Sequence, residues 1–193
     1  MIVPLDITYG KGKRHVAVLT PSQWLAIKDK LNDSYKLRFE YLLQTGMRIS
    51  EARYILEHPD RFREENGAIF LPRVEGMGKD KCKNLSRQIM LSPEGIKIVK
   101  EIIEKNIKLL AYQNMEQVFK RAARDADIDT KYITTKCLRK SIVSWLMACY
   151  PERQEQIAFS IGHDYNTMRG HYLTYGWRKE DIADMRNYVK EWG

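Results

Sequence analysis

The chain has 193 residues, of which 33 are Lys or Arg and 25 are Asp or Glu, so its formal charge is +8 and its isoelectric point is near 9.3. This excess of cations favours an anionic partner, most often nucleic acid, although charge alone also fits a merely basic protein. Three cysteines without a Cys-x-x-Cys pair argue against a disulfide framework and a zinc site, and favour a reducing, cytoplasmic compartment. The sequence has neither a signal peptide nor an apolar run near the roughly 18 residues of a membrane span, so we expect no membrane association.

Residues 1–18 carry a small basic cluster, Lys-Gly-Lys-Arg at positions 11–14, and show no clear hydrophobic period. We expect them to form a basic N-terminal arm that either contacts phosphate or is simply solvated. Residues 19–193 then read as one mainly α domain with a small β-hairpin, which is an α+β fold.

The first helical pattern of this domain starts at Thr20, a preferred capping residue, with Pro21 in its first turn. A second pattern starts at residues 32–34. It ends at Gly46, where the left-handed conformation is cheap only for glycine.

Arg48 follows at the junction of two packed helices, so its guanidinium can be aimed at a target. Ser50 is a candidate cap for the helix that starts here; alternatively, the helix starts earlier and Arg48 already lies in its first turn. Glu51, three residues on, is placed to hold the guanidinium. The simpler interpretation is a surface Arg–Glu pair, worth about 0–1 kcal/mol.

Two β-prone runs, at residues 68–71 and 87–91, flank a segment rich in glycine and lysine. They predict a hairpin with a long basic tip that carries Lys79, Lys81 and Lys83. A lysine on such a tip can reach a phosphate or a leaving oxygen. By charge alone, however, three lysines in five residues are more often a solvated loop.

Apolar spacing predicts three further helices, at residues 93–107, 114–126 and 136–147. Several cations of the second helix lie outside its apolar stripe: Lys120, Arg121 and Arg124. The third helix opens with Lys136, and Arg139 follows on the same face. Two cations near a helix N-terminus oppose the macrodipole unless an anion sits there, and such local conflicts are typical of functional sites.

The next helical pattern, at residues 151–161, ends at Gly162-His163, and Tyr172 follows nine residues after the histidine. A histidine and a hydroxyl at this spacing, in so basic a chain, suggest a tyrosine held near phosphate. Tyr165 and Tyr175 compete with Tyr172 as reactive hydroxyls. The last amphipathic pattern covers residues 178–192.

Taken in this order and at these spacings, the motifs described above resemble those of the tyrosine recombinase/integrase family. The resemblance covers the chain from Leu19 to the C-terminus. Thr-Gly-Met-Arg-Ile-Ser-Glu at residues 45–51 is similar to the family's first arginine box, and Lys-Cys-Leu-Arg at 136–139 to its second. Ile-Gly-His at 161–163 is similar to the Leu-Gly-His element. The resemblance implies the following catalytic residues: Arg48, Lys79 (with Lys81 or Lys83 as alternates), Lys136, Arg139, His163 and Tyr172. Glu51 would support the first arginine.

Two departures from the family pattern matter. Lys136 replaces the usual histidine of the second box, which resembles integrases of archaeal viruses and plasmids and suggests an archaeal mobile element or its relative. A lysine donates to phosphate but is a poorer general base near neutral pH unless its pKa is lowered. Residues 1–18 are also too few for the N-terminal core-binding domain of most members, so we expect that clamp to be absent, whether the chain is naturally minimal or an excised catalytic domain.

The resemblance implies chemistry without a metal or cofactor. Tyr172 would attack a DNA phosphodiester to give a 3′-phosphotyrosyl link and a free 5′-hydroxyl. The 5′-hydroxyl of a partner strand would then attack this link and rejoin the DNA. The two box arginines would grip the nonbridging oxygens, and the hairpin lysine would protonate the 5′-oxygen. His163 and Lys136 would hydrogen-bond the phosphate, and either could assist removal of the tyrosine proton.

Double-stranded DNA is the implied partner, and the chain would act as a homotetramer on two duplexes and as a monomer in solution. The final helix would dock on a neighbour, although packing on its own protomer fits the sequence equally well. Further cations would hold the DNA backbone: Lys81, Lys83, Lys120, Arg121, Arg124 and Lys140. Two alternatives remain, a DNA-binding protein that keeps the fold without the chemistry and a type IB topoisomerase-like relaxing enzyme.

Overall fold

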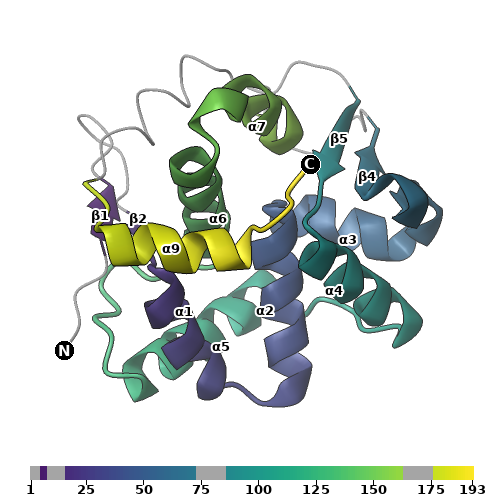
Figure 1. The fold of residues 1–193 in the computed structure, drawn as a ribbon. Coiled ribbons are helices and arrows are strands. Elements are labelled where there is room, and N and C mark those ends of the chain that lie inside the picture. The colour runs from purple at the N-terminus through teal and green to yellow at the C-terminus, as the bar shows by residue number, and fades with distance from the viewer. Residues whose placement is uncertain (1–4, 8–15, 73–85, 163–175) are drawn as a thin grey trace, which may run out of the picture.

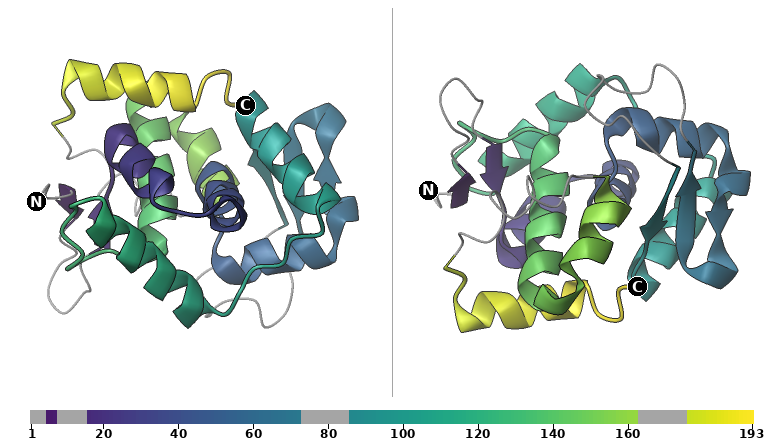
Figure 2. Two further views of the ribbon diagram at one scale, coloured as in Figure 1. Left: turned by 90° about the horizontal axis from the view of Figure 1, so that it is seen from below. Right: turned by 90° about the horizontal axis from the view of Figure 1, so that it is seen from above.

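A computed structural model of the chain describes residues 5–7, 16–72, 86–162 and 176–193. Helices dominate, and two small antiparallel sheets accompany them, so the expected α+β fold is confirmed (Figure 1). Seen along its axis, one helix lies near the middle of the molecule, and the others are arranged around it (Figure 2). This central helix is α2 (Asp33–Thr45), and most of its side chains are buried.

The other described helices have the following bounds: α1 (Pro21–Asp29), α3 (Ile49–Glu57), α4 (Pro93–Glu104), α5 (Tyr112–Asp125), α6 (Lys136–Cys149), α7 (Gln154–Ile161) and α9 (Lys179–Tyr188). Short 3-10 turns lie at Pro59–Arg61, Glu64–Asn66 and Pro151–Arg153. The predicted start of α1 is confirmed, because the Thr20 hydroxyl accepts a hydrogen bond from the backbone N–H of Gln23 at 3.2 Å.

The larger sheet has the order β3 (Phe62–Arg63), β4 (Ala68–Leu71) and β5 (Arg87–Met90). Strands β4 and β5 pair antiparallel with Ile69 opposite Ile89, so the predicted hairpin is confirmed, while its basic tip lies outside the described residues. The sequence did not indicate β3, because two residues are too few to show a period.

The N-terminal segment differs from the expected arm. β1 (Leu5–Ile7) and β2 (Val16–Val18) pair antiparallel, and β2 is buried against α6. Leu19, which follows β2, is bonded to α6 at both backbone groups: its N–H donates to Ser141 Oγ at 2.8 Å, and its carbonyl accepts from Trp145 Nε1 at 2.9 Å. Three residues are again too short for alternation to be visible in the sequence.

An aromatic cluster joins the central helix to α5 and α1. The ring of Phe119 lies 5.1 Å from that of Phe39 and 6.3 Å from that of Trp24, and all three side chains are fully buried. Such tilted contacts add to the free energy gained from burial. The cluster therefore fixes α5 on the domain, and with it the loop that leads to α6.

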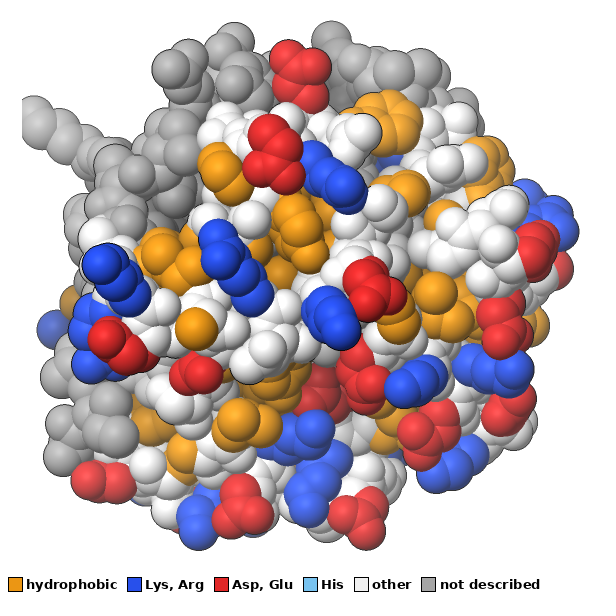
Figure 3. Space-filling view, viewed as in Figure 1, with side chains coloured by type: hydrophobic (Ala, Val, Ile, Leu, Met, Phe, Trp, Pro, Cys, Tyr) orange, Lys and Arg blue, Asp and Glu red, His pale blue; other side chains and the backbone are white. Residues whose placement is uncertain are grey.

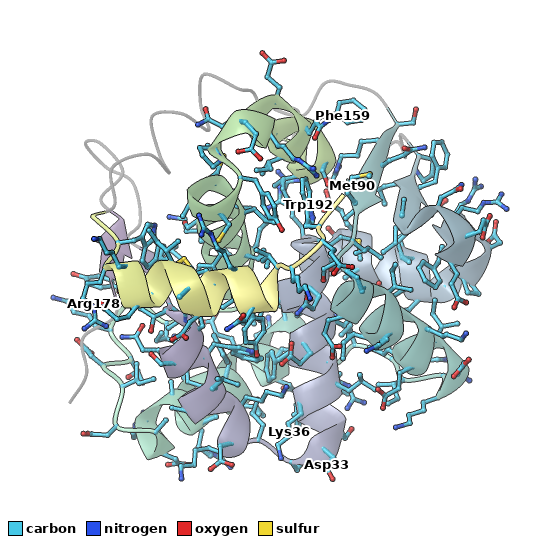
Figure 4. All side chains as sticks on the ribbon, in the orientation of Figure 1. Asp33, Lys36, Met90, Phe159, Arg178 and Trp192 are labelled. Atoms are coloured by element: carbon cyan, nitrogen blue, oxygen red, sulfur yellow. The ribbon has the colours of Figure 1, made fainter. Side chains whose placement is uncertain are left out.

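The final helix packs on its own chain. The Tyr188 hydroxyl donates to Glu40 Oε1 at 3.3 Å, and its ring lies 5.3 Å from that of Trp145. Beyond α9, Trp192 Nε1 donates to the Met90 carbonyl at 3.0 Å, which brings the C-terminal end against β5 and near Phe159 (Figure 4). Packing on its own protomer was one of the two arrangements that the sequence allowed.

Charges of both signs are interspersed on the face that carries α9 (Figure 3). The net positive charge of the chain therefore does not form one continuous patch on this face. No helix among the described residues is both long and apolar enough to span a membrane.

Truncation of the buried aromatic cluster provides a test of this packing. Phe119→Ala should lower the free energy of unfolding by about 3–5 kcal/mol, because it removes a fully buried ring and leaves a cavity. Urea denaturation followed by circular dichroism measures the change. Phe159→Ala is the matched control: Phe159 is 55% exposed, so a loss as large as that of Phe119→Ala would contradict the described core.

Candidate functional site

Three guanidinium groups surround the buried carboxylate of Glu51, whose side chain is only 8% exposed. Glu51 Oε1 accepts from Arg48 Nη1 at 2.8 Å, and Oε2 accepts from the backbone N–H of Arg48 at 2.8 Å. Arg87 Nη2 lies 2.9 Å from Oε2, and Arg139 Nη1 lies 3.6 Å from it. The carboxylate thus joins α3, β5 and α6, which are far apart in the sequence. We call these four residues the arginine cluster.

Glu51 reaches this position because of how α3 begins. Arg48 is the N-cap of α3, with extended φ and ψ of −71° and 152°, and Glu51 at the third helical position bonds back to its N–H. The prediction that Ser50 caps the helix is therefore wrong; the alternative, an earlier start at Arg48, is closer, with Arg48 as the N-cap residue and not in the first turn. The Glu51 carboxylate already satisfies the exposed N–H, so no hydroxyl is needed there.

Arg139 is held by the ends of two helices. Its Nη1 donates to the Gly46 carbonyl at 2.6 Å and its Nη2 to the Ile161 carbonyl at 2.5 Å. Carbonyls at helix C-termini carry partial negative charge and favour a cation. These bonds fix the orientation of a side chain that is only 12% exposed.

Both of these helices end in a left-handed glycine, as predicted. Gly46 has φ of 58°, and a Cβ there would come within 2.9 Å of Ile161 Cδ1; Gly162 has φ of 69°, and a Cβ there would come within 2.9 Å of Arg87 Cζ. Any other residue would be strained by its backbone and would collide with a neighbour. The glycines therefore permit the close approach that brings the arginine cluster together.

A cavity of about 500 Å³ opens beside the arginine cluster. Its cationic lining side chains come from α3, α6 and their N-terminal junctions: Arg48, Arg53, Lys136, Arg139 and Lys140. Among the described residues that line it, none is acidic, and Tyr112, Thr135 and Ser50 add hydroxyl groups. A cavity with this lining suits an anion that accepts several hydrogen bonds.

The N-terminus of α6 also borders this cavity. Thr135 caps the helix without a side-chain hydrogen bond, and Lys136 is its first residue. The N–H of Lys136 donates to Thr134 Oγ1 and that of Cys137 donates to the Thr134 carbonyl. The helix macrodipole still favours an anion here, and a bound phosphate would relieve the predicted conflict between the cations and the macrodipole.

Glu116 on α5 is an acid close to this edge. Partial burial raises the pKa of its carboxyl, but hydrogen bonds from Tyr112 and Lys120 and the nearby charge of Lys136 hold that pKa below its ordinary value. Glu116 is therefore an anion that neighbours Lys136. Glu116 also forms an ion pair at 2.9 Å with Lys120, which is one of the cations predicted to contact DNA.

The remaining predicted site residues are distributed as follows. Lys140 is buried and lines the cavity. Arg121 and Arg124 are exposed on α5. Five others lie outside the described residues: Lys79, Lys81, Lys83, His163 and Tyr172.

Sequence reasoning missed the part played by Arg87. It stands at the start of a predicted strand, and a cation in that position reads as an ordinary surface residue. Only the three-dimensional pairing with Glu51 reveals it. Arg53 and Tyr112 were also missed as cavity-lining residues, because no local motif marks them.

No group of three or more His, Cys, Asp or Glu side chains in the described part of the chain is arranged to hold a metal ion. The candidate site is cationic, and its donors suit an anionic ligand.

Several solved DNA recombinases have a similar structure. A Tn1549 transposon integrase in complex with transposon right end DNA aligns with a TM-score of 0.65 and 17% identity, over 93% of this chain and 68% of that one. XerA recombinase aligns with a TM-score of 0.60 and 14% identity, over 95% and 67%. A lambda integrase dimer bound to a core site aligns with a TM-score of 0.58 and 16% identity, over 89% and 65%. No curated protein matches the sequence.

The fold is thus that of a tyrosine recombinase catalytic domain. The sequence matches the phage integrase family over residues 17–173, and the chain belongs to this family. DNA recombination and integration is accordingly its class of activity.

The Glu51 carboxyl gives a prediction for stability against pH. Although burial raises its pKa, the charges of Arg87, Arg139 and Arg48 lower the pKa from 4.5 to about 2. Since the folded-state pKa is depressed, the stabilisation is fully present above pH 4.5 and is lost as the pH falls to about 2. It is on the order of 3 kcal/mol.

Glu51→Gln should therefore unfold more easily than the unchanged chain at pH 7, and this difference should shrink between pH 4.5 and 2. Denaturant unfolding at several pH values measures it. Glu101→Gln removes a carboxylate from an exposed helical pair with Lys105 and should change stability by less than about 0.5 kcal/mol. A pH-independent difference for Glu51→Gln would rule out the described ionisation.

Proposed function

We propose that the chain cleaves and rejoins double-stranded DNA through a 3′-phosphotyrosyl intermediate, with Tyr172 as the nucleophile. One observation carries the proposal: Arg48, Lys136 and Arg139, which come from two separate boxes of the sequence, line a single cavity with no acidic residue among its described lining. A scissile phosphate is the anion that such a cavity suits in a member of the phage integrase family.

Within this proposal Arg48 and Arg139 differ in how firmly their side chains are oriented before DNA binds. Arg139 is oriented by two backbone carbonyls and by Glu51 before any DNA arrives. Arg48 is 39% exposed and is held at one end by Glu51. Preorganised donors stabilise the charge that develops on the nonbridging oxygens, because they need no reorientation during the reaction.

The proposed cleavage step breaks the bond between phosphorus and the 5′-oxygen and forms one between phosphorus and the Tyr172 oxygen. The tyrosine proton leaves to Lys136 or His163, and Lys79 gives a proton to the 5′-oxygen. The cationic surroundings favour the phenolate, since an unperturbed tyrosine has a pKa of about 10. Ligation is the reverse, with the 5′-hydroxyl of a partner strand as attacker.

A homotetramer on two DNA duplexes is part of the proposal, as is a monomer in the absence of DNA. Because α9 packs on its own chain through Tyr188 and Glu40, assembly would have to add contacts or release that helix. The exposed cations of α5 are proposed to contact the DNA backbone. Because the substrate is DNA, we place the site of action inside the cell.

Covalent trapping tests the proposed function. The unchanged chain, incubated with nicked duplex DNA that loses its 5′-hydroxyl fragment after cleavage, should form a complex that survives a denaturing gel, and Tyr172→Phe should abolish it. Salt-sensitive binding without any covalent complex would instead favour the non-catalytic binder. A complex that survives the substitution would assign the nucleophile to another tyrosine, with Tyr175 the first to test. Relaxation of supercoiled plasmid without strand exchange would favour the topoisomerase-like activity.

Removal of an arginine from the cavity should slow cleavage more than it weakens binding. Arg139→Ala should reduce the rate of covalent-complex formation about 10²–10³-fold, by analogy with the loss of an oxyanion donor. Single-turnover kinetics at saturating DNA measures this rate. An unchanged rate with weaker binding would assign Arg139 to ground-state affinity alone.

The α5 cations give a prediction for salt dependence. Arg124→Gln should reduce the slope of log affinity against log salt by about 0.9, the value expected for one lost phosphate contact. Fluorescence anisotropy of a labelled duplex at several salt concentrations measures the slope. Arg186→Gln is the control, because α9 lies on a face of mixed charge, and an equal effect there would argue against a specific α5 contact (Figure 3).

A further inference from the structure

Arg87, which the family pattern does not mark, contacts several elements of the candidate site. It is the first residue of β5, and its side chain is 11% exposed. Its Nε donates to the Ser160 carbonyl at 3.1 Å, and its Nη2 lies 2.9 Å from Glu51 Oε2. Its Cζ lies so close to Gly162 that a Cβ there would be 2.9 Å away.

These contacts link β5 to α3 and to the end of α7, and through Glu51 to α6. Through Glu51, Arg87 is connected to Arg48 and Arg139. At Ser160 and Gly162 it touches the end of α7, directly before residue 163. Its own strand follows the hairpin segment that carries the lysines.

The distances indicate how Arg87 affects Arg139. Both guanidinium groups approach the same carboxylate oxygen, but Arg87 is closer, at 2.9 Å against 3.6 Å. Arg87 therefore makes the closer ion pair with Glu51, while Arg139 is held both by Glu51 and by the carbonyls of Gly46 and Ile161. Three positive charges and one negative charge also leave the arginine cluster at +2 for the phosphate.

We propose that Arg87 is a positioning residue for DNA strand cleavage: it holds Glu51 and the Ser160–Gly162 turn so that Arg48 and Arg139 are set on the scissile phosphate. This inference rests on the proposed function. A buried arginine that served stability alone would change the free energy of unfolding but not the rate constant of the folded enzyme.

The test compares Arg87→Lys and Arg87→Met with the unchanged chain, each shown to be folded by circular dichroism. Lysine keeps the charge but loses the planar guanidinium, which hydrogen-bonds the Ser160 carbonyl through Nε while its Nη2 pairs with the Glu51 carboxylate. Arg63→Met is the matched control, because Arg63 is an exposed arginine on β3 of the same sheet and its loss changes the net charge equally. Single-turnover formation of the covalent complex on the nicked duplex gives the saturating rate and the half-saturating DNA concentration.

Both Arg87 variants should lower the saturating rate about 100-fold, as displacement of a positioned group by about 1 Å does, with a much smaller change in half-saturation. Arg63→Met should keep the saturating rate. Folded Arg87 variants that cleave at the unchanged rate, or whose defect is confined to half-saturation, would overturn the inference. A double variant adds a second test: Glu51→Gln with Arg87→Met should be no slower than Arg87→Met alone, whereas multiplied defects would contradict a shared unit.

A readout without DNA separates this inference from the proposed function. Carboxyl NMR titration should show the pKa of Glu51 rising from about 2 toward 4.5 in Arg87→Met. If the Glu51 titration is unchanged in Arg87→Met, the proposed coupling between Arg87 and Glu51 is overturned, even if cleavage is slow. If the unchanged chain forms no covalent complex, the proposed function fails, and the titration alone then decides whether Arg87 controls Glu51.

Discussion

The ion pairs of one buried carboxylate organise this molecule. Burial of the Glu51 carboxylate alone would cost free energy, because the charge loses its hydration. Three nearby guanidinium groups compensate this cost. Each of these groups would also repel the other two without the carboxylate between them. The Glu51 side chain therefore lets this chain hold three guanidinium groups close together while the fold remains stable.

The backbone provides the complementary half of this arrangement. Two helices end at Gly46 and Gly162, and the carbonyls of Gly46 and Ile161, at these two ends, meet on Arg139. Side-chain charge and helix ends thus act on the same guanidinium. The aromatic cluster of Phe39 and Phe119 lies elsewhere and supports the site only by fixing α5. Stability and chemistry are consequently separable in this chain, except in the arginine cluster.

Much of the fold could be predicted because its signals are local. Thr20 acts through a hydroxyl that bonds three residues along the chain, and Gly46 and Gly162 act through their own backbone, so the helix boundaries they mark were predicted correctly. Arg48 and Arg139 were recognised by their neighbours in sequence. The strands β1, β2 and β3 have two or three residues each and leave no period to detect. Arg87 was missed for a different reason: its partner is 36 residues away, and pairing across that separation has no local signature.

The span of these contacts has a consequence for synthesis on the ribosome. Gly46 and Arg139, which bond directly, are 93 residues apart, and the Ile161 carbonyl is made later still. A nascent chain that has produced Arg48 and Glu51 therefore still lacks Arg87 and Arg139. The complete set of contacts on Arg139 forms only once Ile161 has been made. Until Ile161 has been made, Arg139 therefore lacks one of the two carbonyls that orient its guanidinium.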